Sequence, residues 1–370
     1  MQHMTPYKGQ YDKTLLFAIL MLLVISVVMV YSASSVVALT TYDDSLFFMK
    51  RQLLWAAFGL ALLTVTMRID HHILSGQRVV LAIMVISFVL LAVTLVPGVG
   101  RMVNGSRRWL RLGMMSFQPA ELAKFAVVVY LSYYIAKKGE RIRDFMNGMV
   151  PAYVVTVLFL SVAVLQPDFG SAMTLACVAG IMLFAGGANV LHIGGTVLAV
   201  LPLVIFAVTH KAYRWRRIVA FLDPWSDPQG AGHQIIQSFL AFGSGGLFGR
   251  GLGEGRQKLF FLPERHSDFI YAVIGEELGL IGAIVVILLF LIILWRGVRI
   301  VLAVGDPFSR LLALGITLLI CLQGLINMAV VTGLLPTKGI ALPLVSYGGT
   351  SLVITMGALG VLLNVSRETG

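Results

Sequence analysis

The sequence predicts an all-α, polytopic integral membrane protein of about ten transmembrane helices. Of its 370 residues, 58% are hydrophobic and 12% are charged, whereas a soluble domain carries about 25% charged residues. The mean hydropathy is +0.90. Apolar runs of roughly 17–25 residues recur along the chain, and each is long enough to cross the hydrocarbon core of a membrane as a helix. We therefore expect a single transmembrane domain over residues 1–370.

Ten apolar runs define the expected spans. The first run is too long for the apolar core of a signal peptide, so we expect it to be retained. The connection between the seventh and eighth spans, residues 210–268, is too long for an ordinary link, which indicates a functional loop. Cys177 and Cys321 fall inside apolar runs and are not expected to form a disulfide or a metal pair. In chain order the spans are 14–36, 51–67, 78–97, 118–136, 147–165, 171–187, 190–209, 269–295, 308–334 and 343–365.

The distribution of Lys and Arg predicts the orientation. Short connections on the side of the termini are rich in basic residues, whereas the short connections on the opposite side contain only Lys338. This bias predicts cytoplasmic termini and an extracytoplasmic loop at 210–268. Two outer connections break the rule. The connection 210–268 carries eight basic residues, which a long loop can translocate regardless of charge. The connection 98–117 carries four arginines, which suggests that it holds an anion. These are Arg101, Arg107, Arg108 and Arg111, close to Trp109. The net charge of +11 does not indicate nucleic acid, because the basic residues are scattered between spans; anionic lipid is the more natural partner.

Four of the expected helices begin with polar residues, and all four enter from the same membrane surface because they are the even-numbered spans. Acidic residues at such places are costly in a membrane and indicate function. By the Lys/Arg bias, this surface is the outer one. The four starts are Gln118-Pro119-Ala120-Glu121 with Lys124 one turn on, Gln166-Pro167-Asp168, Glu264-Arg265-His266-Ser267-Asp268, and Ser346-Tyr347-Gly348-Gly349-Thr350-Ser351. Glu276 and Glu277 follow inside the eighth span.

Each polar feature also has a plainer interpretation. Ser267 or Asp268 could cap a helix, and Glu121 with Lys124 could be a buried structural ion pair, since the two are three residues apart. The glycine-rich stretch 243–253 matches no nucleotide-binding fingerprint and is either a surface turn or a backbone contact to phosphate. The aromatic and basic stretch 211–218 suggests anchoring at the membrane surface.

The residue types restrict the chemistry. No Ser/His/Asp order, HExxH motif or Cys/His metal set occurs in the sequence, so carboxylates are the expected chemical groups. A carboxylate can act as a general base towards a hydroxyl, and nearby cations can stabilise a phosphate leaving group. This combination predicts transfer onto a hydroxyl from a phosphate-activated, lipid-borne donor.

Several long motifs occur in one order: WLRLGMMSFQPAELAKF (109–125), LQPDFGSA (165–172), FLDPWSDPQGAGHQIIQS (221–238), FLPERHSDFIYAVIGEELGLIG (261–282) and GLLPTKGIALPLVSYGGTS (333–351). They resemble the SEDS family (shape, elongation, division and sporulation) of bacterial inner-membrane peptidoglycan glycosyltransferases. The stretch Pro336-Thr337-Lys338-Gly339 resembles the cell-division member more than the elongation member.

The resemblance implies ten spans, cytoplasmic termini and polymerisation of lipid II into glycan strands, beside a class B penicillin-binding protein and other cell-division proteins at the septum. It implies that Asp268 is catalytic and that Glu121, Lys124 and Asp168 matter. Substrate-binding candidates are these three together with Arg107, Arg108, Trp109, Gln118, Glu264, Arg265, His266, Ser346 and Tyr347.

The expected reaction is an inverting transfer in which Asp268 accepts the proton of the acceptor 4-hydroxyl and undecaprenyl pyrophosphate leaves. His266 either orients Asp268 or faces solvent. Cations near Asp268 stabilise its charged form and weaken it as a base, so Asp268 could instead bind a divalent cation, Mg²⁺ or Mn²⁺. The alternative functions are a lipid II flippase, an elongation-type polymerase or a scaffold of the division complex.

Overall fold

The computed structural model describes residues 9–103, 106–112, 115–210, 212–230, 232–255 and 266–369. This part of the chain is mainly α-helical, with one small sheet. Its α-helices are α1 (Lys13–Tyr42), α2 (Phe47–Arg68), α3 (Gln77–Val93), α4 (Pro119–Lys138), α5 (Val150–Leu165), α6 (Phe169–Ala185), α7 (Val190–Thr209), α8 (Ala212–Leu222), α9 (His233–Gly245), α10 (Ile270–Glu277), α11 (Gly279–Ala303), α12 (Pro307–Val331) and α13 (Gly349–Val365), and its strands are β1 (Gly100–Val103), β2 (Ser106–Leu112) and β3 (Met115–Phe117).

The predicted all-α membrane class is confirmed, and a helix lies at each of the ten predicted positions. Among the described residues, six helices are long and apolar enough to cross a membrane: α1, α2, Phe145–Leu165, α11, α12 and Gly349–Thr369. Three shorter apolar helices are Gln77–Val93, Phe169–Ala185 and Val190–Leu203. Helix α4 has the length of a span but carries Glu121 and Lys124. The number of ten crossings and the orientation stay predictions.

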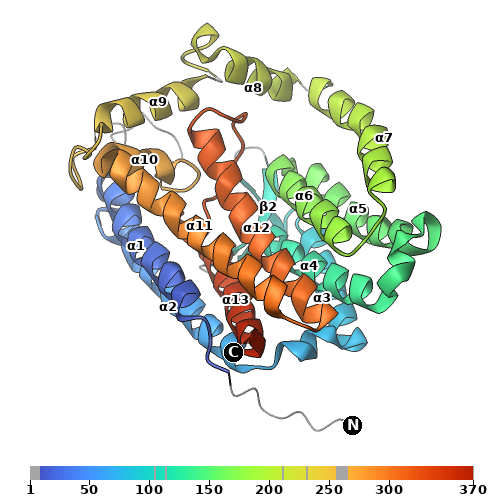
Figure 1. The fold of residues 1–370 in the computed structure, drawn as a ribbon. Coiled ribbons are helices and arrows are strands. Elements are labelled where there is room, and N and C mark those ends of the chain that lie inside the picture. The colour runs from blue at the N-terminus through green and yellow to red at the C-terminus, as the bar shows by residue number, and fades with distance from the viewer. Residues whose placement is uncertain are drawn as a thin grey trace.

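Helices α12 and α13 form the centre of the bundle (Figure 1). Helix α12 packs against α4, α6, α11 and α13, and α13 packs most extensively against α2. Small residues allow this close approach: the Thr66 hydroxyl of α2 donates to the Gly357 carbonyl of α13 at 3.0 Å. Helices α7, α8 and α9 pass around the outside of the bundle (Figure 1), and none of the described residues of α7 is buried.

The predicted eighth span is broken between α10 and α11. Gly279 has φ +69°, a left-handed conformation that favours glycine and interrupts the helical hydrogen bonds. The glycine-rich stretch replaces them. The N–H groups of Arg250 and Gly251 donate to the carbonyls of Glu276 and Glu277, both at 3.0 Å, and the N–H of Leu280 donates to the Gly246 carbonyl at 2.9 Å. The backbone groups of a helix end are thereby satisfied.

These contacts give the stretch 243–253 a structural role. Residues 246–253 form turns that are mostly exposed, as the surface-turn interpretation predicts. The N–H groups of Arg250 and Gly251 are bonded to the helix break and are therefore not available to a phosphate. Residues 210–268 also contain two helices, α8 and α9, where the sequence suggested a loop. Glu264 and Arg265, both candidate site residues, lie outside the described residues.

The connection 98–117 forms a three-stranded antiparallel sheet in the order β1-β2-β3, which the sequence did not predict. Trp109 of β2 pairs with Arg101 of β1, and Leu110 pairs with Phe117 of β3. Arg108 is the extra residue of a bulge in β2, because Arg101 pairs with Trp109 and the next residue, Met102, pairs with Arg107. A bulge interrupts the alternation of side chains and can redirect the side chain of the extra residue.

Candidate active site at the helix starts

The backbone before α10 is held by the connection between α12 and α13. The Tyr347 N–H donates to the His266 carbonyl at 2.9 Å, and the Ser346 hydroxyl donates to the Ser267 carbonyl at 2.6 Å. The Asn327 side-chain amide of α12 donates to the Asp268 carbonyl at 2.8 Å and to the Ile340 carbonyl at 2.6 Å. Three consecutive carbonyls, those of residues 266 to 268, are thus fixed by α12 and by the connection that follows it.

Asp268 does not cap a helix. The residue before α10 is Phe269, and no side chain caps this helix start, so the N-cap interpretation of Ser267 or Asp268 is wrong. The Asp268 carboxylate instead lies against Gly339. A Cβ atom at Gly339 would stand 3.1 Å from Asp268 Oδ2 and 4.0 Å from Arg108 Nη1. A carboxylate and a guanidinium therefore face the same point above a residue that has no side chain.

Arg108 connects this point to the start of α6. Its Nη1 lies 3.7 Å from Asp168 Oδ1, its Nε donates to the Ser106 hydroxyl at 2.7 Å, and its Nη2 donates to the Pro167 carbonyl. Asp168 also caps α6 by accepting from the N–H and the hydroxyl of Ser171, at 3.1 and 2.9 Å. The structure thus brings Asp268, Arg108, Asp168 and Gly339 together, and we refer to these four residues as the Asp268 site.

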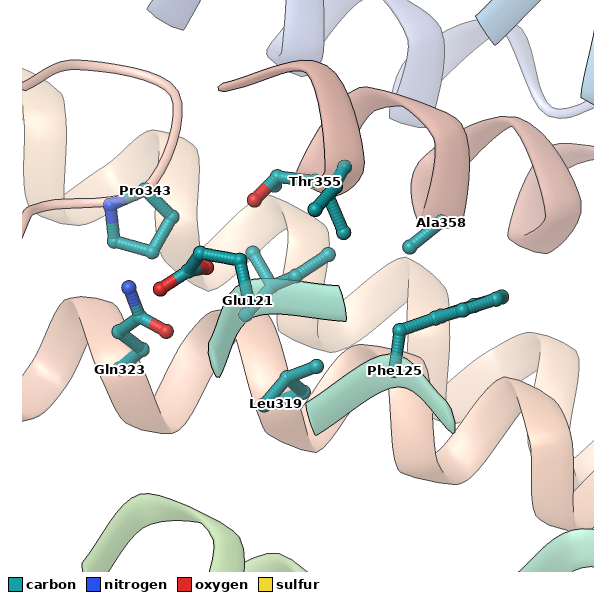
Figure 2. Close-up of a pocket in the computed structure, with 9 residues that line it drawn as sticks. Glu121, Phe125, Leu319, Gln323, Pro343, Thr355 and Ala358 are labelled. Carbon is teal, nitrogen blue, oxygen red and sulfur yellow. The ribbon is translucent and has the colours of Figure 1, made fainter. Parts of the chain in front are cut away.

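Glu121 and Lys124 form a separate, buried group deeper in the bundle, the Glu121 cluster. Lys124 Nζ donates to Glu121 Oε1 at 2.8 Å and to Gln323 Oε1 at 2.6 Å, and the Ser351 hydroxyl donates to Glu121 Oε2 at 3.1 Å. Figure 2 shows the Glu121 carboxylate between Gln323 and Pro343, with the Phe125 ring pointing away towards Ala358. The cavity here is ≈ 10 Å³, which has room for about one water.

The two groups are linked through α12 and the connection after it. The Gln323 amide of the Glu121 cluster donates to the Ala341 carbonyl at 3.1 Å, two residues from Gly339. At the start of α4, the Gln118 N–H donates to the Thr350 hydroxyl at 3.3 Å, and this hydroxyl donates to the Ser116 carbonyl at 3.0 Å. The starts of α4 and α13 therefore lie side by side.

Three further candidate residues, His266, Arg107 and Trp109, are not among the four residues of the Asp268 site. The His266 ring lies between the rings of Phe48 and Tyr347, with centroid distances of 4.9 and 5.6 Å. This packing orients the imidazole by aromatic contact. Arg107 and Trp109 are the residues of β2 on either side of Arg108 and pair with β1; no contact of their side chains connects them with the Asp268 site among the described residues.

Three residues that contribute to these groups were not singled out from the sequence as site residues: Gln323, Asn327 and Gly339. Gln323 and Asn327 carried a signal, since they are polar residues four positions apart and therefore share one face of an apolar span. Gly339 had no such signal. Its role is to leave space for the side chains of Asp268 and Arg108, and a sequence pattern does not show such space.

The donor atoms around Asp268 do not favour a divalent cation. Such ions take six or more ligands that are mostly oxygens. Among the described residues, the side chain between Asp168 and Asp268 is the cation Arg108. The arrangement is that of a carboxylate beside a fixed positive charge.

The fold and site define a class: a polytopic membrane protein in which two aspartates and an arginine meet at one end of the helix bundle. The family model of FtsW, RodA and SpoVE, described as "Cell cycle protein", matches residues 13–370. The chain belongs to this family, and the resemblance seen in its motifs is confirmed.

Relatives cover nearly the whole chain. The "Probable peptidoglycan glycosyltransferase FtsW" of Trichlorobacter lovleyi is 50% identical over 97% of this chain and 93% of that protein. The "Stage V sporulation protein E" of Bacillus subtilis is 44% identical over 98% and 99%.

Solved structures share the fold. A chain from a structure described as "Structural coordination of polymerization and crosslinking by a peptidoglycan synthase complex" is similar with a TM-score of 0.79 and 30% identity, covering 97% of this chain and 98% of that one. The rod shape determining protein RodA of Thermus thermophilus is similar with a TM-score of 0.70 and 27% identity, covering 97% of each chain.

Proposed function

We propose that this protein is a peptidoglycan glycosyltransferase that polymerises lipid II into glycan strands at the outer face of the bacterial cytoplasmic membrane. Its family and its relatives named peptidoglycan glycosyltransferase support the activity. The observation on which the site assignment rests is that the Asp268 carboxylate and the Arg108 guanidinium face one point beside Gly339. The Lys/Arg bias predicts that this end of the bundle is the outer one.

In the proposed reaction Asp268 accepts the proton of the acceptor GlcNAc 4-hydroxyl as its oxygen attacks C1 of the donor MurNAc. The bond from C1 to the pyrophosphate oxygen breaks on the opposite side, so the configuration at C1 inverts. Undecaprenyl pyrophosphate leaves with the electron pair of that bond. Arg108 is the cation beside Asp268 that can stabilise this developing negative charge, because a preorganised positive charge acts strongly in a water-poor site.

The relatives favour a role in cell division. In this role the protein would act at the septum beside a class B penicillin-binding protein. Relatives named FtsW are 40–50% identical and the sporulation protein is 44% identical, whereas the RodA structure is 27% identical. The complex that contains a similar chain is described as coordinating polymerisation and crosslinking, which supports a transpeptidase partner.

A lipid II flippase is the alternative that the buried polar residues suggest, since Lys124, Glu276 and Glu277 lie inside the bundle. The Glu121 cluster gives it little support, because its cavity of ≈ 10 Å³ is closed by its own hydrogen bonds. Two results together would favour the flippase. The Asp268→Ala variant would translocate labelled lipid II in liposomes, and the parent would not polymerise it.

The test of the proposal is the Asp268→Asn variant with purified protein, labelled lipid II and the transpeptidase partner. Asparagine keeps the size of the side chain and removes the base, so polymerisation is expected to fall roughly 10²–10⁴-fold. Asp223→Asn is the matched control, because Asp223 lies in the 210–268 segment and, within the described residues, its carboxylate caps a short turn through the Trp225 N–H, as asparagine also can. Polymerisation by Asp268→Asn at the parent rate would refute the assignment.

A further inference from the structure

Two adjacent histidines lie at the opposite end of α2 from the Asp268 site. His266 packs on Phe48 at the start of α2, and His71 and His72 follow its end. The 22 residues of α2 separate the two places by roughly 33 Å. Here the turn His71–Ser75 meets the start of α12 and the C-terminal turn Ser366–Thr369. The group of side chains, the His71 cluster, consists of Asp70, His71, His72, Asp306, Ser309, Asn364 and Glu368.

The hydrogen bonds of the cluster determine which ring nitrogen of each histidine carries a proton. His71 Nδ1 lies 2.6 Å from Asn364 Oδ1, and the Asn364 amide group donates to the Met67 carbonyl at 2.9 Å. The oxygen of Asn364 therefore faces His71 as an acceptor, so Nδ1 is the donor. His72 Nδ1 lies 2.9 Å from Asp70 Oδ1, again an acceptor. Both histidines are thus held through Nδ1, and the Nε2 atom of each is directed elsewhere.

Both Nε2 atoms face the same carboxylate. Glu368 Oε1 lies 2.9 Å from His71 Nε2 and 3.7 Å from His72 Nε2, and Asp306 Oδ2 lies 3.9 Å from His72 Nε2. His71 Nε2 also lies 2.8 Å from the Ser309 hydroxyl, which donates to Asp306 Oδ2 at 2.8 Å, so a bound metal would replace the contact between His71 and Ser309. Ligand atoms at 2.0–2.1 Å from a tetrahedral Zn²⁺ are about 3.3 Å apart. A hydrogen bond from the other ring nitrogen to a carboxylate or amide oxygen is the usual support of a metal-binding histidine.

The charges of the cluster are suited to a cation. His71 and Glu368 are buried, with side chains 1% and 9% exposed, and Asp70 and Asp306 add two carboxylates. An unpaired buried carboxylate is costly.

We propose that His71 Nε2, His72 Nε2 and Glu368, with Asp306 as the fourth ligand, bind Zn²⁺. Imidazole ligands favour zinc over magnesium or calcium. The carboxylate of Asp70 and the ring nitrogens of His71 and His72 also lie within 4.8 Å of one another. Because the Nδ1 atoms already donate hydrogen bonds, Asp70 orients His72 and does not bind the metal. The ion joins the C-terminal turn to the start of α12 and to the turn after α2.

The experiment measures zinc binding by the full-length protein in detergent, purified without a polyhistidine tag and treated with a chelator. Titration against a zinc indicator is expected to give one site per chain in the parent. His72→Ala and Glu368→Gln are each expected to weaken binding by at least roughly 10- to 100-fold, the range that loss of even an outer partner causes. The His72 side chain is 26% exposed and glutamine keeps the size of Glu368, so both variants are expected to fold.

His210→Ala is the matched control, because His210 is exposed and stacks on Phe206 away from the cluster; it is expected to bind zinc as the parent does. Co²⁺ added to the parent is expected to give the intense visible absorption of a tetrahedral site, and His72→Ala is expected to lose it. The proposal is overturned if the parent binds zinc no more tightly than His72→Ala does. It is also overturned if either His72→Ala or Glu368→Gln binds zinc as tightly as the parent. The cluster would then be an ion-pair network only.

Discussion

Arg108 is the residue through which the two aspartates of the Asp268 site meet. Its position on β2 is fixed by the Ser106 hydroxyl and the carbonyls of Gln166 and Pro167. Its charge thereby lies beside both Asp168 and Asp268. A guanidinium that is held by several acceptors loses little freedom when it binds an anion. This preorganisation is what the proposed stabilisation of a pyrophosphate leaving group requires.

Gly339 leaves the space in which these charges face each other, so a methyl group there is expected to disturb the reaction. In Gly339→Ala the new Cβ would contact Asp268 Oδ2 at 3.1 Å and displace the carboxylate. Polymerisation is expected to fall on the order of 10-fold, less than the ~100-fold that a displacement of 1 Å causes. The control is Gly305→Ala, in the connection before α12, where a Cβ meets no atom within 4 Å. Equal rates for both variants would show that the space above Gly339 is not used.

The Glu121–Lys124 pair is expected to contribute to stability through its burial. Lys124→Met leaves the Glu121 charge buried without its cation, which is expected to lower the free energy of unfolding by about 3–5 kcal/mol. The double variant Glu121→Leu, Lys124→Met removes both charges and is expected to be more stable than Lys124→Met alone. Thermal unfolding in detergent measures both. The control is Lys50→Met at the exposed pair Lys50–Asp44, where little change is expected. A double variant that is the least stable of the set would contradict this account.

At the scale of elements, the helices were predictable because each apolar run must satisfy its backbone hydrogen bonds internally. The starts of α4 at Pro119 and of α6 after Asp168 were also predictable, since proline and a capping aspartate act locally. No local sequence pattern predicts the packing of α8 and α9 or the contacts of Asn327. Both depend on residues that lie far apart in the chain.

Two elements could not be predicted for identifiable reasons. The sheet β1-β2-β3 lies in a short connection rich in arginine and glycine, where alternation is weak and the pairing includes a bulge between Arg101 and Met102. The break of the eighth span at Gly279 gives no hydropathy signal, because residues on both sides are apolar. The break exists because residues 246–251 supply its hydrogen bonds.

This dependence makes the α10–α11 break testable. In Gly279→Ala the residue must adopt φ +69° with a Cβ that approaches the backbone of Leu247 and Gly249. The variant is expected to lose more than about 1 kcal/mol of unfolding free energy, since alanine is strained there. Gly180→Ala in α6, where a Cβ meets no atom within 4 Å, is expected to be neutral or stabilising. The two variants are compared by thermal unfolding, and equal stability would argue against a strained break.

At the scale of the molecule, α12 is the element on which the groups converge. Its residues Gln323 and Asn327 contact the Glu121 cluster and the Asp268 backbone, and its first turn provides Asp306 and Ser309 to the His71 cluster. The two ends of one buried helix therefore carry the proposed catalytic site and the proposed zinc site. A helix that is packed against α4, α6, α11 and α13 is a rigid support for both.

The orientation of the bundle decides whether the Asp268 site faces the outside, and it can be measured. Both native cysteines are free and are first replaced by alanine, Cys177→Ala with Cys321→Ala. Ser226→Cys, at an exposed position between α8 and α9, is then expected to react with a membrane-impermeant maleimide on intact spheroplasts, because the Lys/Arg bias places residues 210–268 outside. Glu140→Cys, at the exposed turn after α4, is expected to react only after lysis. Labelling in the reverse order would place the Asp268 site in the cytoplasm, where transfer at the outer leaflet is excluded, whereas the helical fold would be unaffected.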